Sequence, residues 1–222
     1  MLKGFLLGVC VDIHMLKGFL LGVGVTLALT PFIPDIEYRI RMFLINCACS
    51  LMSDEEKSRM DAAAQDETYE GMITPADIDR NGHANNARFI RELCFSRRRH
   101  FVRLGIWKIL DREGLNMFVI AQTIRYRKEL KLFQRYKIFS KILAVSDEER
   151  CLYLESRFVT DGFVAAVHVC KYKIVSKKDI RLKASQILAE AGLPSLPSTC
   201  PFVDSWDAAN AISSRELNPL KP

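Results

Sequence analysis

The chain has 222 residues and a net charge of +6, and it contains 49% hydrophobic and 26% charged residues. This composition excludes a wholly disordered chain, and the length leaves room for one good-sized domain with extensions. A charge of +6 spread over a chain of this length has by default no functional meaning; otherwise it suits an anionic ligand or an anionic membrane surface. The absence of a nucleic-acid-reading motif argues against DNA or RNA as a partner.

The N-terminal 34 residues predict a membrane anchor. An uncharged stretch of 17 residues follows Lys17, which is the lower limit for a helix that spans a bilayer. Four basic residues come after this stretch, and by the positive-inside rule they place the main domain on the cytosolic side: Arg39, Arg41, Lys57 and Arg59. We expect the endoplasmic reticulum membrane. A secreted protein released by signal-peptide cleavage is the alternative.

A perfect repeat precedes this anchor. The nonapeptide MLKGFLLGV occurs at residues 1–9 and again at residues 15–23, a period too short for a repeat protein. Residues 1–14 are therefore interpreted as a local duplication or as the result of an upstream start codon. The rest of the chain divides into a juxtamembrane connector, a main domain and a C-terminal extension: residues 35–67, 68–180 and 181–222.

The seven cysteines form no metal-binding pattern. None belongs to a CxxC pair or to a Cys/His cluster with zinc spacing, so no metal site is expected. We interpret the cysteines as reduced thiols, which favours a domain that faces the cytosol.

The main domain begins with a strand, a loop and a helix. TYEGMIT, residues 68–74, is predicted to be a strand that ends before Pro75. The loop PADIDRNGH is rich in turn residues, and Asn85 or Asn86 then suits the N-cap of a long helix. Gly105 ends this helix, and a short second helix is predicted through WKILDREG.

Helical spacing divides the long helix into two faces. The apolar face is predicted to contain Ala87, Ile90, Leu93, Cys94, Phe101 and Leu104. The solvent face is predicted to contain Arg88, Arg91, Glu92, Arg98, Arg99 and Arg103.

Four strands are predicted after the helices. Period-two alternation begins at Met117, and turn signals follow at SDEER and at the dipeptide Asp161 and Gly162. One strand, one long helix and four consecutive strands indicate an α+β domain, with an antiparallel five-stranded sheet wrapped around the helix. A short terminal helix is predicted from Trp206 to Leu217.

The loop motif carries a resemblance to a known family. DRNGHANNARF resembles the D-x-N-x-H-x-N-N-x-x-[YF] motif of plant acyl-carrier-protein thioesterases, and it is similar to the D-x-x-G motif of the 4-hydroxybenzoyl-CoA thioesterase group. NNARFIRE, YLESRFV and DGFVAA resemble an animal branch of the same acyl-CoA thioesterase-like superfamily. The resemblance implies a hotdog fold and the hydrolysis of an acyl thioester of coenzyme A or a carrier protein. Coenzyme A would then enter only as part of the substrate, with no separate cofactor.

The resemblance also implies a catalytic trio. Asp79 would supply the carboxylate, Asn81 would orient the reacting groups, and His83 would donate a hydrogen bond or relay a proton. Backbone N–H groups near the helix start, at Gly82, Asn85 and Asn86, suit a thioester carbonyl that becomes negative. Against this stands the simpler interpretation that the loop serves only as a turn and a helix cap.

Basic residues elsewhere are candidates for the phosphates of coenzyme A. Arg125 and Arg127 flank the second predicted strand and would meet these phosphates or anionic lipid. The run of Arg97, Arg98, Arg99 and His100 would do the same, or it would form a solvated helix face, which is the favoured interpretation.

Two functions stay open for the domain. It is either a hydrolase or a hotdog domain that binds acyl thioesters or partner proteins without hydrolysis. One such unit leaves a sheet edge unpaired and its acyl site half-built. This predicts a homodimer, or a higher even-numbered assembly, with Asp79 of one subunit near strands of the other.

Overall fold

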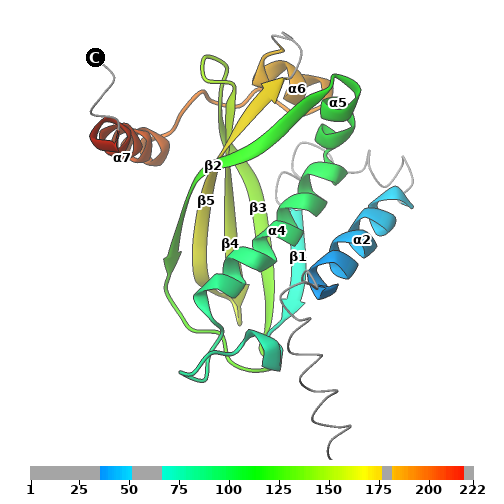
Figure 1. The fold of residues 1–222 in the computed structure, drawn as a ribbon, viewed down its shortest axis with the longest axis vertical. Helices are drawn as coiled ribbons and strands as arrows, with labels where there is room; N and C mark the ends of the chain where they lie inside the picture. Colours follow the sequence, from blue (N-terminus) through cyan, green and yellow to red (C-terminus); the bar gives the residue numbers. More distant parts are fainter. Residues whose placement is uncertain (1–35, 52–66, 177–181, 218–222) are drawn as a thin grey trace, which may run out of the picture. The chain divides into compact units, whose positions relative to one another are not determined.

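The computed structural model describes residues 36–51, 67–176 and 182–217 (Figure 1). The predicted anchor, residues 1–34, lies outside the described residues. Helix α2, Ile36–Ser50, falls in the predicted connector and exposes Ile36, Ile40 and Phe43. Across the described ranges, no helix is both long and apolar enough to cross a membrane.

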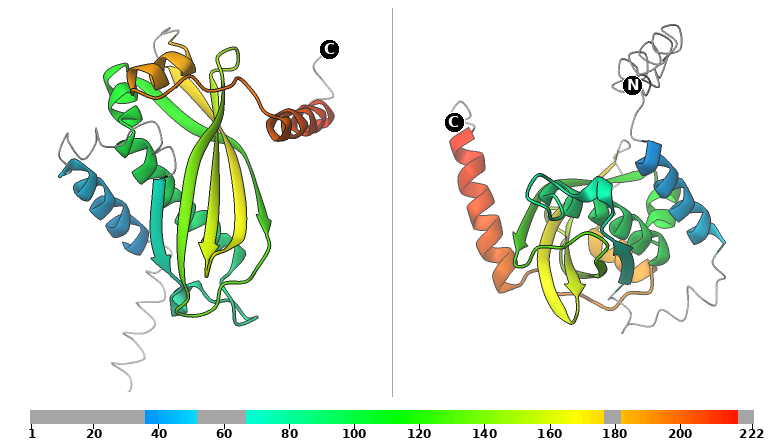
Figure 2. Two further views of the ribbon diagram at one scale, coloured as in Figure 1. Left: turned by 180° about the vertical axis from the view of Figure 1, so that it is seen from behind. Right: turned by 90° about the horizontal axis from the view of Figure 1, so that it is seen from below.

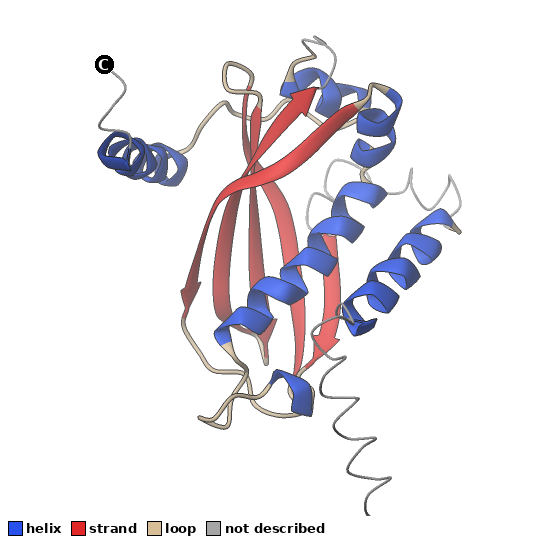
Figure 3. Ribbon diagram, in the orientation of Figure 1, coloured by secondary structure: helices blue, strands red, loops and turns tan. Residues whose placement is uncertain are grey.

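The main domain is built on one antiparallel sheet of five strands (Figure 3). The strands are β1 Glu67–Met72, β2 Leu115–Tyr126, β3 Arg135–Ser146, β4 Cys151–Thr160 and β5 Phe163–Ser176. Their spatial order is β1-β3-β4-β5-β2, so β1 and β2 form the two edges. The predicted strands and turns are confirmed. Asp161 and Gly162, which join β4 to β5, both have positive φ, as a two-residue hairpin turn of this twist requires.

Helix α4, Asn86–Arg103, covers one face of the sheet, and the view from behind in Figure 2 places the sheet in front of it. Asn85 is the N-cap, as predicted: its side-chain oxygen accepts a hydrogen bond from the Ala87 N–H at 2.9 Å. This arrangement of one long helix inside a five-stranded antiparallel sheet is the expected hotdog fold. Gly105, with φ 73°, separates α4 from helix α5, Ile106–Arg112.

The predicted faces of α4 are partly wrong. Leu93, Phe101 and Leu104 are buried as expected, but Ala87 is exposed. Glu92, predicted on the solvent face, is buried. The error has a physical cause, because the α4 side that meets the sheet carries polar groups. Ser96 Oγ lies 3.3 Å from Ser140 Oγ on β3, for example.

The basic run on α4 is not a solvated face, and it does not point as a whole toward a surface ligand. Arg97 is 8% exposed and His100 is fully buried, while Arg98 and Arg99 are half-buried. Both interpretations of this run are therefore wrong for Arg97 and His100. A polar residue on the inner side of a helix looks like a surface residue in the sequence, because periodicity assigns faces by hydrophobicity.

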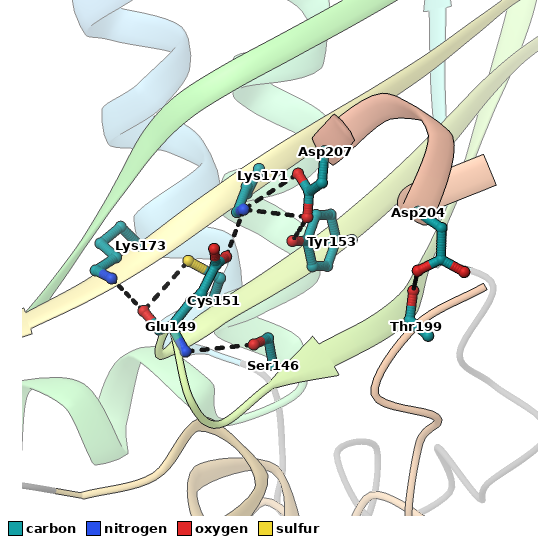
Figure 4. A network of polar contacts seen from close by, with 9 residues as sticks. All are labelled: Ser146, Glu149, Cys151, Tyr153, Lys171, Lys173, Thr199, Asp204 and Asp207. Atoms are coloured by element: carbon teal, nitrogen blue, oxygen red, sulfur yellow. Dashed lines mark hydrogen bonds and ion pairs between the residues drawn. The ribbon is translucent and has the colours of Figure 1, made fainter. Parts of the chain in front are cut away.

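The C-terminal extension contains two helices, α6 Ala184–Glu190 and α7 Pro201–Leu217. The sequence did not predict α6, and α7 begins five residues before the predicted start at Trp206. Val203 of α7 packs on the sheet face opposite α4, against Ala144 and Tyr153. A polar network fixes this contact (Figure 4): Lys171 Nζ lies 3.1 Å from Asp207 of α7, and the Tyr153 hydroxyl donates to the same carboxylate.

Candidate functional site

The loop before α4 is anchored by Asp77. Its carboxylate accepts hydrogen bonds from the Thr74 N–H at 2.8 Å and from the Thr74 hydroxyl at 2.6 Å. It also lies 3.7 Å from the Arg88 guanidinium on α4. The Asp77 carbonyl accepts a hydrogen bond from the Asn85 N–H at 2.8 Å. Asp77 is therefore engaged in holding the loop against the helix start.

Asp79 and His83 close a tight turn. The Asp79 N–H donates to the His83 carbonyl at 3.0 Å, and the Gly82 N–H donates to the Asp79 carbonyl at 3.0 Å. Gly82 has φ 79°, a backbone conformation that residues other than glycine adopt only at a steric cost. The turn brings Asp79 Oδ1 to 3.9 Å from His83 Nδ1. The four-residue spacing of the motif thus places a carboxylate beside an imidazole.

The other groups around these two side chains have defined roles. Asp79 Oδ1 accepts a hydrogen bond from the Asn81 N–H at 2.8 Å, while the Asn81 residue is exposed. His83 Nδ1 lies 3.2 Å from the Ala84 carbonyl. Since a carbonyl only accepts, this contact requires the proton on Nδ1 and leaves Nε2 as the basic nitrogen.

Most of the candidate backbone donors are already used. The Gly82 N–H donates inside the turn, and the Asn85 N–H donates to Asp77. The Asn85 side-chain oxygen accepts a hydrogen bond from the Ala87 N–H. The N–H of Asn86, the first residue of α4, has no carbonyl one turn earlier within the helix, and it is the best placed of the predicted donors. Gly82 and Asn85 therefore shape the loop, and Asn86 is the candidate donor to an oxyanion.

The predicted phosphate-binding arginines, Arg125 and Arg127, lie at the end of β2 and just after it. Tyr126, at the end of β2, donates its hydroxyl hydrogen bond to the Asn86 carbonyl at 3.0 Å, so its side chain points toward the start of α4. Arg125 precedes it in the strand, so its side chain points to the opposite face. Arg127 donates to the Val164 carbonyl at 3.3 Å and stacks 4.9 Å above the Phe163 ring. Neither arginine is directed at the Asp79 loop.

A small interior pocket lies behind the loop, and sequence reasoning missed its polar residues. Its cavity volume is about 10 Å³, enough for about one water molecule. Glu92 lines it, is 5% exposed and accepts a hydrogen bond from the Tyr136 hydroxyl at 2.8 Å. Gly71 of β1 makes space for this pair, since a Cβ there would lie 2.3 Å from Tyr136 Oη. A glycine inside a strand is the signal that was present in the sequence, because it marks a close approach.

Buried histidines predict an acid-sensitive fold. Burial lowers the pKa of His100 and of His168 to about 3 in the folded protein, against 6.5 as the ordinary value. Below pH 6.5 the unfolded chain binds protons that the folded chain excludes. Stability should therefore fall as the pH drops from about 6.5 toward 3, by roughly 1.4 kcal/mol per pH unit for each histidine.

The variant His100→Leu tests this prediction. Both ring nitrogens of His100 are buried without a hydrogen-bond partner among the described residues, so leucine leaves no partner unsatisfied. The urea midpoints of wild type and variant should differ little at pH 7.5, and the variant should be clearly more stable at pH 5. Equal losses in both proteins between these pH values would contradict the assignment.

Comparisons with known proteins identify the family of the chain. The profile of the thioesterase-like superfamily matches residues 73–190. The chain is 31% identical over 155 residues to Protein THEM6 from Xenopus laevis, and this match covers 69% of this chain and 72% of that protein. It is 34% identical over 143 residues to Protein THEM6 from Danio rerio, which covers 64% and 67% respectively. Among solved structures, the probable thioesterase YbaW from Escherichia coli shares 18% identity with a TM-score of 0.49, covering 56% of this chain and 94% of that one. The family match spans more than half of the chain, and the relatives from Xenopus laevis and Danio rerio confirm the resemblance to an animal branch. The protein therefore belongs to the thioesterase-like superfamily.

Proposed function

We propose that the protein hydrolyses acyl thioesters, with acyl-CoA as the substrate class, and that Asp79 is the reacting carboxylate. Thioesters of acyl carrier protein are the second substrate class. One observation carries the proposal: Asp79 and His83 meet across a turn that leads directly into the N-terminus of α4. Family membership supports the reaction type, and this geometry supports the assignment of residues.

The proposed reaction uses water as the nucleophile. Asp79 takes a proton from a water molecule as the water oxygen attacks the thioester carbonyl carbon. The Asn86 N–H and the positive end of the α4 dipole stabilise the oxygen that becomes negative. The carbon–sulfur bond then breaks, and the sulfur leaves as a thiol because His83 relays to it the proton that Asp79 took from the water. Asn81 holds the Asp79 carboxylate through its backbone N–H.

The acyl group needs a second subunit in this proposal. A cavity of about 10 Å³ behind the loop has no room for an acyl chain. The β2 edge exposes Phe118, Val119 and Ile120, which are 56%, 38% and 54% exposed. An apolar strand with an unpaired edge favours pairing with another copy of the chain. We therefore infer a homodimer in which the strands of one subunit complete the acyl site at Asp79 of the other.

We further propose that residues 18–34 anchor the protein in the endoplasmic reticulum membrane, with the thioesterase domain facing the cytosol. The uncharged sequence and the basic residues that follow it support this arrangement. The protein should sediment with microsomes, and its C-terminus should be digested by protease added outside sealed vesicles. Glycosylation of an acceptor site introduced near the C-terminus would contradict the orientation. A soluble secreted form cleaved near Thr30 would contradict the anchor.

A binding function without hydrolysis is the second candidate, and the positions of the backbone donors favour it. Because Gly82 and Asn85 use their N–H groups inside the loop, the site offers fewer oxyanion donors than the motif suggested. Hydrolysis assays on the purified full chain with a series of acyl-CoA chain lengths separate the two functions. Release of free coenzyme A supports the enzyme. Tight binding of acyl-CoA without release supports the binding protein.

A further inference from the structure

Helix α4 carries a buried arginine that contacts no carboxylate among the described residues. Arg97 is 8% exposed, and its Nη1 atom is buried without a hydrogen-bond partner in the same ranges. Nη2 donates to the Cys94 sulfur at 3.2 Å, and the guanidinium also contacts the Cys170 thiol. Thiols are weak acceptors, and burial raises the pKa of Cys170 to about 11, so that this thiol is neutral. The charge of Arg97 is therefore poorly compensated.

A second unsatisfied group lies on the neighbouring strand. His168 is fully buried on β5, two residues before Cys170, and both side chains face α4. Its Nε2 lies 3.3 Å from Gln122 Oε1, and its Nδ1 is buried with no partner in the part of the chain that the structure describes. The Arg97 charge reaches His168, whose pKa is lowered first by burial and then by this arginine. The two side chains thus belong to one polar cluster between α4 and β5.

The cluster lies close to the β2 edge of the sheet. Gln122 of β2 pairs with Cys170 and is exposed, and Cys94 of α4 is half-buried. Asn86, Ile90 and Cys94 follow one another at four-residue spacing along the same side of α4 and lead from the Asp79 loop to Arg97. Eleven residues of helix separate Asn86 from Arg97, which is a distance of roughly 16 Å. This distance is comparable to the length of an extended medium-chain acyl group.

We propose that Arg97 and His168 form a binding site for the carboxylate of an aliphatic chain. A guanidinium binds a carboxylate through paired N–H hydrogen bonds, and Arg97 donates these to the ligand. His168 donates to the same carboxylate from Nδ1 in the tautomer in which the Gln122 amide NH₂ group donates to Nε2. An unpaired charge in the interior is costly, and a ligand carboxylate removes this cost. The ligand is a free fatty acid or an acyl thioester with a second carboxylate at its far end. The latter source rests on the proposed function, because its thioester would then lie at Asp79.

Thermal unfolding of the full-length protein with decanoate or decanol tests the site without any hydrolysis. Wild type should be stabilised by decanoate well beyond decanol, which has the same chain and no charge. Arg97→Met should have a higher melting temperature than wild type without ligand, because methionine removes an unpaired buried charge. Its affinity for decanoate should fall at least about tenfold, to the level of decanol. Arg99→Met, a matched arginine on the same helix, should keep the decanoate response.

Cys94→Asp provides an independent test in case Arg97→Met does not fold. Cys94 already contacts Arg97, so aspartate there supplies an internal carboxylate. This variant should be more stable than wild type and should lose the decanoate response. A thioether analogue of an ω-carboxyacyl-CoA distinguishes the two ligand sources. If wild type binds this analogue more tightly than the plain decanoyl analogue, and Arg97→Met does not, the ligand is the acyl thioester with a second carboxylate. Equal responses of wild type to decanoate and decanol would overturn the proposal. A full decanoate response in Arg97→Met or in Cys94→Asp would also overturn it.

Discussion

Asp79→Asn is expected to lower thioester hydrolysis at least tenfold while leaving the fold intact. The asparagine side chain keeps an oxygen that accepts the hydrogen bond from the Asn81 N–H, so the turn should persist. It cannot take a proton from water at neutral pH, and general-base groups typically contribute on the order of 10²–10⁴-fold. The measurement is kcat with a saturating acyl-CoA, together with circular dichroism of the same preparation.

Asp77→Asn is the matched control, because it makes the same chemical change two residues earlier. The Asp77 carboxylate accepts two hydrogen bonds from Thr74 and lies near Arg88. The side-chain amide of the variant should therefore weaken these contacts and lower the stability of the loop. Activity per folded molecule should fall less than in Asp79→Asn. If a folded Asp79→Asn retained wild-type kcat, the reacting carboxylate would have to be another residue, and buried Glu92 would be the first to examine.

Ile120→Lys is expected to convert the dimer into a monomer and to abolish most of the hydrolysis. Ile120 is 54% exposed on the β2 edge, at an irregularity in the pairing of β2 with β5. A lysine on a strand edge opposes pairing with another copy because two like charges would meet at the interface. The measurement is light scattering at tens of micromolar on a chain that lacks residues 1–52, since the predicted anchor would obscure the mass.

Leu132→Lys controls for the loss of an exposed apolar side chain. Leu132 is 43% exposed in the segment between β2 and β3, away from the β2 edge, so its variant should remain dimeric and active. A wild-type chain that is monomeric and still hydrolyses acyl-CoA would show that one subunit contains the whole site. The shared-site proposal would then be wrong.

Local sequence signals were sufficient for most of the fold. Alternation marked the four consecutive strands, the Asp161 and Gly162 turn fixed their hairpin, and Asn85 marked the start of α4. The inner face of α4 could not be predicted, because Glu92, Arg97 and His100 are polar yet buried. Their burial depends on partners in distant strands, such as Tyr136 for Glu92, and periodicity within one helix has no access to these.

The site was predictable to the extent that it is local. Asp79, Gly82 and His83 lie within five residues, and backbone hydrogen bonds inside the loop bring them together. The prediction that Arg125 binds a phosphate stays a prediction, and its side chain is not the one that reaches the loop, because one position along a strand reverses the direction of a side chain. Tyr126 points toward the helix start instead and donates to the Asn86 carbonyl.

The central claim is that an acyl thioester reacts at the Asp79 turn beside the N-terminus of α4. A structure of the protein with a non-hydrolysable acyl-CoA analogue tests it most directly. We predict that the atom replacing the thioester carbonyl oxygen lies near the Asn86 N–H, and that the carbon beside it has a water molecule held by Asp79 within roughly 3–3.5 Å. An analogue whose reactive end lies away from this turn, with Asp79 unchanged and in contact only with its own loop, would contradict the claim.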